Sequence, residues 1–213
     1  MAQKNKKKNK EWHRQHVGDH HVRLAREKGF RSRAAFKLLE IQRRDKIFRV
    51  GMNVADLGAA PGSWSQVIAK EIGKRGTVVA IDCLDLRPVE GVIVLKKSLL
   101  DQDFFDCLGA EVGNIKFDVV VSDLAPNMSG IPEVDQSAML NLMDVAIKFT
   151  RLKLKPGGTF LVKVFEGLNI LPVRSTINRN FKNASARKPQ ASRRNSAEFY
   201  LVGRQFVGLA DRK

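Results

Sequence analysis

Cysteine and long apolar runs are scarce in this chain of 213 residues. Its two cysteines, Cys83 and Cys107, are too few for a disulfide scaffold or a CxxC-type metal site. Both lie in or beside apolar runs, where we expect small buried side chains. No apolar run approaches the ~18 residues of a transmembrane helix. The lysine-rich start lacks the apolar stretch of a secretory signal. We therefore expect a cytoplasmic protein with no membrane partner.

Acidic residues are also under-represented. The 38 Lys and Arg against 22 Asp and Glu give a net charge of +16. Such an excess predicts a polyanionic partner, with nucleic acid first and an acidic membrane surface second; a merely soluble basic protein is the alternative. Residues 1–20 read as a disordered basic arm. Residues 174–197 contain no acid, and we expect them to form a basic loop facing RNA, or else a solvated loop. The cations of this stretch are Arg174, Arg179, Lys182, Arg187, Lys188, Arg193 and Arg194.

The middle of the chain alternates between β and α patterns. We expect helices over 29–48, with Ser32 as N-cap, over 63–73, and over 136–155, stopped by Pro156-Gly157-Gly158. Strands are expected over 52–58, 76–85, 92–100, 116–126, 159–165 and 198–206. This alternation predicts a mostly parallel sheet with helices on both faces, in a single domain over 21–209.

The stretch DLGAAPGSW, 56–64, ends the first strand in a glycine-rich turn. Gly58 and Gly62 let main chain approach a ligand, while Pro61 removes a donor that a pyrophosphate cradle would use. Asp82 ends the next strand, where an acidic side chain accepts hydrogen bonds from ribose hydroxyls. Together these features fit S-adenosylmethionine, although nucleotide-binding α/β folds share most of them. A tight connection without a ligand, and an N-cap role for Asp82, are the alternatives.

Several segments then resemble one family. They are FRSRAAFKLLEI, DLGAAPGSWSQV, SDLAPNMSG, GGTFLVKVFEG and SAEFYLVG. From about residue 11 to residue 208 the chain resembles the FtsJ-type ribosomal RNA large-subunit uridine 2′-O-methyltransferases of bacteria. The resemblance implies a Rossmann-like S-adenosylmethionine-dependent methyltransferase fold with a mostly parallel seven-stranded sheet. It also implies methyl transfer to a ribose 2′-hydroxyl of 23S ribosomal RNA in the assembled large subunit.

The resemblance also assigns site residues. The catalytic set carried over is Lys37, Asp123, Lys163 and Glu198. The cofactor contacts are Gly62, Trp64, Asp82 and Asp123, to which the turn adds Gly58. One position departs from the family: where an acidic residue is usual near the adenine, this chain has Ser98, and Asp101 is the alternative.

The chemistry of a ribose hydroxyl gives these residues roles. A positioned base must remove a proton from a poor nucleophile. We expect Lys163 to be this base, Asp123 to orient it, and Glu198 to hold Lys37 or the ribose. A plain buried salt bridge between Lys163 and Asp123 is the alternative, since lysines are rarely buried unless paired. Trp64 packs either on the cofactor or in the core.

Other readings are weaker. A methyltransferase that acts on the amino group of a base would carry N/D-P-P-aromatic where this chain has SDLAP. An enzyme that methylates a cytosine carbon would need a nucleophilic cysteine on the catalytic face, where we expect none. A dehydrogenase is disfavoured by the glycine pattern. The alternative from another class is a non-catalytic RNA-binding ribosome-assembly factor with the same fold. We expect a monomer that recognises RNA mainly by shape, because Tyr200 is its only tyrosine. No metal site is expected from the histidines His13, His16, His20 and His21.

Overall fold

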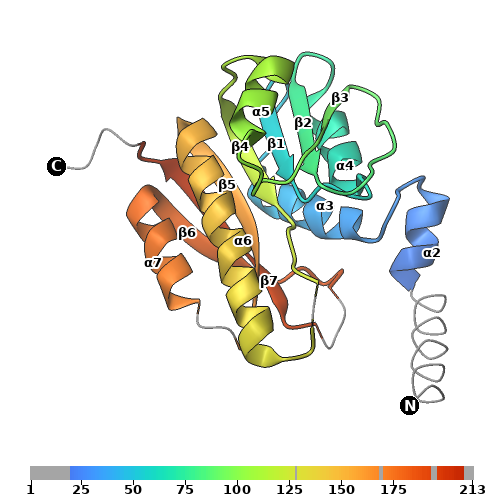
Figure 1. Ribbon diagram of the computed structural model, residues 1–213. Coiled ribbons are helices and arrows are strands. Elements are labelled where there is room, and N and C mark those ends of the chain that lie inside the picture. The colour runs from blue at the N-terminus through green and yellow to red at the C-terminus, as the bar shows by residue number, and fades with distance from the viewer. Residues whose placement is uncertain (1–19, 128, 168–169, 193–195, 209–213) are drawn as a thin grey trace.

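A seven-stranded sheet in the order β3-β2-β1-β4-β5-β7-β6 forms the centre of the molecule (Figure 1). The computed structural model describes residues 20–127, 129–167, 170–192 and 196–208. Strands β1 to β5 pair in parallel, and β7 pairs antiparallel with β5 and β6, which confirms the expected fold class. The strands are β1 (Asn53–Leu57), β2 (Thr77–Asp82), β3 (Val92–Lys96), β4 (Phe117–Ser122), β5 (Leu154–Phe165), β6 (Phe181–Arg187) and β7 (Glu198–Phe206).

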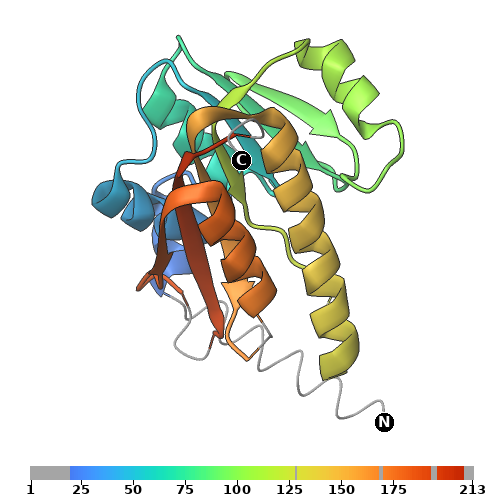
Figure 2. The same cartoon turned by 90° about the vertical axis from the view of Figure 1, so that its left-hand side faces the viewer.

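Helices cover both faces of the sheet. Side chains of α5, α6 and α7 share one apolar core with the strands, and those of α3 and α4 share a second core on the opposite face (Figures 1 and 2). The short helix α2 packs beside α3, away from the sheet. The helices are α2 (His20–Glu27), α3 (Ala34–Asp45), α4 (Ser63–Ile72), α5 (Phe104–Val112), α6 (Pro132–Lys153) and α7 (Leu171–Asn180).

The alternation of side chains along the strands decides what lies on each face. Val120 packs in the α5–α6–α7 core, whereas Val121 and Leu161 pack in the α3–α4 core. Successive side chains of a strand point to opposite faces. Asp123 and Lys163, each two residues further on, therefore lie toward α3 and α4. The same face of the sheet receives polar side chains from both strands at their carboxyl ends.

The helix expected over 29–48 begins later than predicted. Helix α3 starts at Ala34, and Arg33 occupies the N-cap position without a side-chain capping bond. Ser32 instead accepts a hydrogen bond from the Ala34 N–H at 3.2 Å and shares one with Ser63 Oγ at 2.8 Å. Ser32 therefore fastens the segment before α3 to the start of α4, which corrects its predicted role as N-cap.

The long helix does not end at Pro156-Gly157-Gly158, as the sequence predicted. Helix α6 begins at Pro132, a favoured first residue, and ends at Lys153. Residues 156–158 lie inside β5, because Leu154 already pairs with Phe117 of β4. The register between β4 and β5 shifts beyond that pair, and Gly157 at φ +79° supplies the irregular backbone.

The basic stretch 174–197 is also not one loop. Most of α7 and all of β6 fall within it, and only the segment after Arg187 connects to β7. The sequence of β6, FKNASAR, gives no apolar alternation, because an edge strand buries little of its surface. Helix α5, with Phe104 and Leu108 buried, was not predicted either.

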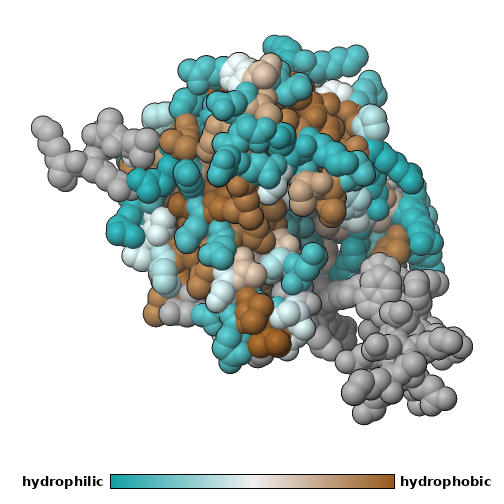
Figure 3. Space-filling view, viewed as in Figure 1, coloured by the Kyte–Doolittle hydropathy of each residue, from teal (hydrophilic) through white to brown (hydrophobic). Residues whose placement is uncertain are grey.

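The described surface is mixed in character. On the face drawn in Figure 3, hydrophobic and hydrophilic residues are interspersed. In the part of the chain that the structure describes, no helix combines the length and apolar character needed to cross a membrane. The predicted basic arm covers residues 1–20, of which 1–19 lie outside the described residues. Its last residue, His20, begins α2.

Candidate active site

A pocket of about 410 Å³ opens at the carboxyl ends of β1, β2 and β4. Its walls come from the turn after β1, the end of β2, the segment after β3 and the loop after β4. The size suits a small molecule, and the position is where α/β sheets bind ligands. Of the predicted cofactor residues, Gly58, Asp82, Ser98 and Asp123 line it.

Gly58 allows two loops to meet at the floor of this pocket. Its φ of +75° is one that side-chain-bearing residues rarely adopt. A Cβ on Gly58 would lie 2.9 Å from Leu124 Cδ2 and 3.0 Å from the Leu124 backbone nitrogen. The glycine is therefore required by the approach of the β4 loop as well as by the turn.

Asp82 joins the turn to the loop after β2. Its Oδ2 accepts the Ala60 N–H at 2.9 Å, and its Oδ1 accepts the Leu84 N–H at 2.8 Å. A carboxylate has about four acceptor positions, so lone pairs remain for a ligand's hydroxyl groups. This is the arrangement expected of a residue that binds a ribose diol.

The structure also separates the two candidates for the adenine side. Ser98 lines the pocket, and its Oγ accepts the Leu100 N–H at 3.1 Å. Asp101 is not among the lining residues; its carboxylate accepts the Ser98 N–H at 3.1 Å. Ser98 therefore faces the ligand space, and Asp101 holds the backbone behind it.

Trp64 takes the core alternative. Its side chain is 2% exposed, and its Nε1 donates to the Ala34 carbonyl at 2.9 Å. Its ring packs against Tyr200, with 5.6 Å between centroids. Neither Trp64 nor Gly62 lines the pocket. The Trp64 side chain is therefore part of the core, and a contact of Trp64 or Gly62 with the cofactor stays a prediction.

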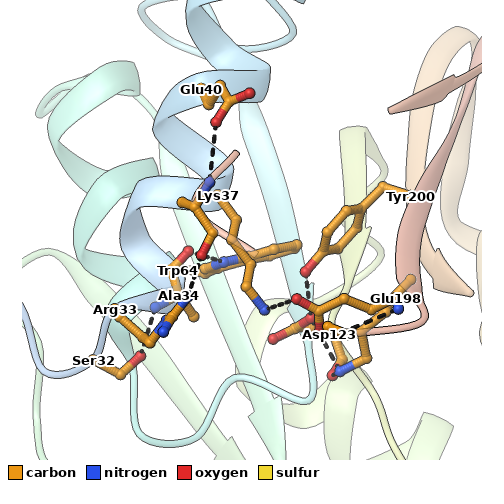
Figure 4. A network of polar contacts seen from close by, with 12 residues as sticks. Ser32, Arg33, Ala34, Lys37, Glu40, Trp64, Asp123, Glu198 and Tyr200 are labelled. Carbon is orange, nitrogen blue, oxygen red and sulfur yellow. Dashed lines mark hydrogen bonds and ion pairs between the residues drawn. The ribbon is translucent and has the colours of Figure 1, made fainter. Parts of the chain in front are cut away.

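The four predicted catalytic side chains lie close together beside the pocket, on the α3–α4 face. Figure 4 shows three of them, Lys37, Asp123 and Glu198. Lys163 Nζ donates to the Asp123 backbone carbonyl at 2.5 Å and lies 3.1 Å from Asp123 Oδ1. Lys37, on α3, forms an ion pair with Glu198, at the start of β7. The side chain of Lys163 is only 8% exposed and that of Asp123 is 21% exposed. Two charge pairs thus lie in a site that admits little water.

Tyr200 belongs to this cluster and was missed. Its hydroxyl donates to Asp123 Oδ1 at 3.0 Å (Figure 4). Tyr200 is 0% exposed, so its ring is not available to stack on an RNA base. Burial raises the pKa of Tyr200 well above its usual value, and the charge of Asp123 adds to this. The sequence held one indication of this role. Tyr200 follows Glu198 by two residues on β7, so the two side chains lie on the same face of the strand.

The Lys37 ammonium keeps Glu198 ionised. Burial alone would raise the pKa of Glu198, but the hydrogen bond and the charge of Lys37 outweigh it and hold the pKa below its usual value. Glu198 therefore holds Lys37, which is one of the two roles expected for Glu198. The other role, a contact with the ribose, stays a prediction.

Asp56, the first residue of the DLGAAPGSW stretch and the second-to-last residue of β1, is a buried carboxyl close to the site. It is 0% exposed; Ser65 Oγ donates to its Oδ2 at 2.6 Å, and its Oδ1 has no hydrogen-bond partner. Burial raises the pKa of Asp56 to about 7, against the Ser65 hydrogen bond, and the charges of Asp123 and Asp82 raise it further. Two carboxylates, Asp82 and Asp123, line the pocket and favour a ligand that carries positive charge, while Asp56 is buried outside its lining.

Asp56→Asn is expected to change how stability depends on pH. The folded-state pKa of about 7 lies above the usual aspartate value of 3.8. Between these two pH values the folded protein therefore keeps a proton on Asp56 that the unfolded chain has lost. Stability then falls as pH rises from about 4 to about 7, by roughly 4 kcal/mol for such a shift. Denaturant unfolding without ligand should show Asp56→Asn gaining on the wild type over this range. Parallel pH profiles would contradict the assignment.

Cys83 differs from its expectation. Its side chain is exposed and lines the pocket, and Cys107 is half-buried. Of the histidines, His13 and His16 lie outside the described residues, while His20 and His21 begin α2 with their rings 5.8 Å apart. Across the described ranges, no group of three or more His, Cys, Asp or Glu side chains could hold a metal ion.

Comparisons with known proteins agree on one family. The model of the FtsJ-like methyltransferases matches residues 30–206. A Dechloromonas aromatica protein named ribosomal RNA large subunit methyltransferase E is 44% identical over 195 residues, which cover 92% of this chain and 95% of the relative. A protein of the same name from Azoarcus is 44% identical over 200 residues, 94% of this chain and 98% of the relative.

Solved structures show the same architecture. A Plasmodium falciparum structure, titled as a ribosomal RNA methyltransferase, superposes with a TM-score of 0.75 at 25% identity, covering 84% of this chain and 100% of that one. An Aeropyrum pernix fibrillarin with bound S-adenosyl-L-methionine shares the fold, with a TM-score of 0.55 at 14% identity over 81% of this chain and 74% of that one. The family-model match over residues 30–206 and the 44% identical relatives place this chain in the FtsJ-like methyltransferase family.

Proposed function

We propose that the protein transfers a methyl group from S-adenosylmethionine to the 2′-hydroxyl of a ribose in RNA, namely a uridine of 23S ribosomal RNA in the assembled large subunit. The observation that carries the proposal is the Lys163–Asp123 pair beside a pocket of nucleoside size. The ribosomal substrate is inferred from the names of the relatives, which are called ribosomal RNA large subunit methyltransferases. A ribosomal substrate places the reaction in the cytoplasm, and a monomer suffices because one chain holds all four charged groups.

The pocket residues fit this cofactor. Asp82 has acceptor positions left for ribose hydroxyls, and Leu84, Leu99 and Leu100 offer apolar surface to a base. The carboxylates of Asp82 and Asp123 suit a ligand with a sulfonium and an ammonium group. When bound, S-adenosylmethionine supplies a methyl group that is already activated on positively charged sulfur.

The charged residues then act on the acceptor. Lys163, in its neutral form, accepts the proton of the 2′-hydroxyl, so that the oxygen attacks as the proton leaves. The Asp123 carbonyl and carboxylate, within 2.5 Å and 3.1 Å of Nζ, stabilise the ammonium that forms. Tyr200 fixes the Asp123 carboxylate from behind. Lys37, held by Glu198, presents a second cation near the developing alkoxide.

The RNA-binding surface extends over α7 and β6. An open groove of about 640 Å³ between them is lined by Arg174, Ser175, Asn178 and Arg179. Within the described part of 174–197, Arg187 pairs with Asp45 and Lys188 with Glu166. Arg174, Arg179 and Lys182 are exposed and form no ion pair with another described residue. Phosphate groups of RNA complement these cations.

Arg174→Glu/Arg179→Glu is expected to weaken RNA binding and to make it less sensitive to salt. Each lost phosphate contact lowers the log–log salt slope by roughly 0.7 to 0.9. The matched control is Lys70→Glu/Lys74→Glu, the same change of charge at two exposed positions, one in the last turn of α4 and one just after the helix. Affinity for ribosomal RNA, measured between about 50 and 200 mM salt, should fall for the first pair only. Equal losses in both would show that only net charge matters.

The function itself is tested by methyl transfer from labelled S-adenosylmethionine to unmethylated large subunits, free 23S RNA and small subunits. The proposal predicts label in large-subunit RNA, with whole subunits preferred to free RNA. Binding of cofactor and RNA with no transfer to any substrate would favour the non-catalytic assembly factor instead.

A further inference from the structure

Arg31 connects three parts of the site that are distant in sequence. Its Nη1 donates to the Pro61 carbonyl at 3.0 Å and to the Arg87 carbonyl at 2.5 Å, and its Nη2 donates to the Pro88 carbonyl at 2.6 Å. Pro61 belongs to the turn after β1. Arg87 and Pro88 belong to the loop between β2 and β3, which begins with the pocket residues Cys83 and Leu84.

Gly62 lies directly beside this arginine. Gly62 has φ +100° and is buried, but it does not line the pocket. A Cβ there would lie 2.6 Å from Arg31 Nη1. The open space beside Gly62 is thus filled by the guanidinium, from the side of the turn away from the ligand space.

The segment around Arg31 is itself fastened to α4. The Arg31 N–H donates to Gln66 Oε1 at 3.0 Å, and Gln66 Nε2 donates to the Gly29 carbonyl at 3.1 Å. Six residues after Arg31, α3 carries Lys37. One guanidinium therefore ties the helix that bears Lys37 to both walls of the pocket, while Asp82 ties the same two walls together from inside.

We propose that Arg31 is a positioning residue for the cofactor: it holds the turn after β1 and the β2–β3 loop at the separation that the cofactor needs. This rests on the proposed function. A planar guanidinium donates to three carbonyls at once, which a lysine ammonium at the end of a flexible stem reproduces poorly. A phosphate contact is the other role open to this half-buried arginine in a basic protein, and the two roles give different results.

The test uses Arg31→Lys and Arg31→Met, with Arg87→Ala as the matched control, because Arg87 takes part through its carbonyl and its side chain is exposed. Calorimetric titration should show S-adenosylmethionine binding about tenfold weaker in Arg31→Lys and weaker still in Arg31→Met. Arg87→Ala should bind as the wild type does. At saturating cofactor, kcat of Arg31→Lys should remain within about threefold of wild type, with RNA affinity and its salt slope unchanged.

Weaker RNA binding with unchanged cofactor affinity would overturn the proposal and make Arg31 a phosphate contact. A fall in kcat and thermal stability without a change in cofactor affinity would leave only a role in folding, and would also overturn it. Failure of the wild type to bind S-adenosylmethionine would instead refute the proposed function, so the two failures are distinguishable.

Discussion

Lys163→Met is expected to reduce methyl transfer by about 10²- to 10⁴-fold, the range that a positioned general base contributes. Methionine keeps the length and apolar stem of lysine but cannot accept or hold the proton. Lys163 is not among the residues lining the pocket, so the dissociation constant of S-adenosylmethionine should stay within about twofold. Single-turnover rates on large subunits, with titration of the cofactor, measure both quantities.

The same strand supplies the control. Lys155, near the opposite end of β5, forms an ion pair with Asp118 at 2.8 Å. Lys155→Met removes the same charge and the same kind of pair away from the site, and it should transfer methyl groups at the wild-type rate. Comparable losses in both variants, or a Lys163→Met variant with normal activity, would remove Lys163 from its role as base.

Asp82→Ala is the second large expected effect, acting on cofactor binding. The variant loses the carboxylate that accepts the Ala60 and Leu84 N–H groups and the positions open to ribose hydroxyls. Hydrogen bonds to a charged group contribute about 1.5–3 kcal/mol each, so losing two ribose contacts weakens binding by about 10²-fold or more. Calorimetric titration of S-adenosylmethionine checks this.

Asp85→Ala is the matched control for that experiment. Asp85 lies three residues further along the same loop, is exposed, and pairs with Lys96 at the surface. Its loss should leave cofactor affinity unchanged, because surface ion pairs contribute little. If Asp82→Ala bound the cofactor as tightly as Asp85→Ala, the ribose would have to lie elsewhere.

The parts of the fold that were predictable from sequence are those in which the local pattern and the tertiary environment agree. The continuous apolar run of β4 and the closing Gly73 of α4 are examples, since a strand buried on both faces and a helix end leave direct signals. Edge strand β6 was missed because its outer surface needs no apolar residue. Helix α6 ends where Leu154 finds a strand partner, a cause that no local pattern reveals.

The site was predictable to a similar degree. The charged side chains of the family pattern do meet. Asp123 and Lys163 lie at the carboxyl ends of β4 and β5, the antiparallel strand β7 begins at the same edge with Glu198, and Lys37 comes from α3. What sequence did not show is which neighbours each side chain satisfies. Trp64 binds the Ala34 carbonyl instead of facing the pocket, and Tyr200 supports Asp123 from the core. The role of Arg31 depends on three carbonyls from two loops, and backbone acceptors leave no trace in composition.

The central claim is that the acceptor is a ribose hydroxyl served by Lys163. The most direct test digests large-subunit RNA, methylated by the purified protein with labelled S-adenosylmethionine, completely to nucleosides and identifies the labelled species by mass spectrometry. The account predicts label in 2′-O-methyluridine, at a linkage that resists alkaline cleavage, and its loss with Lys163→Met. Label on a base, or ribose label that persists at the wild-type level in Lys163→Met, would contradict it.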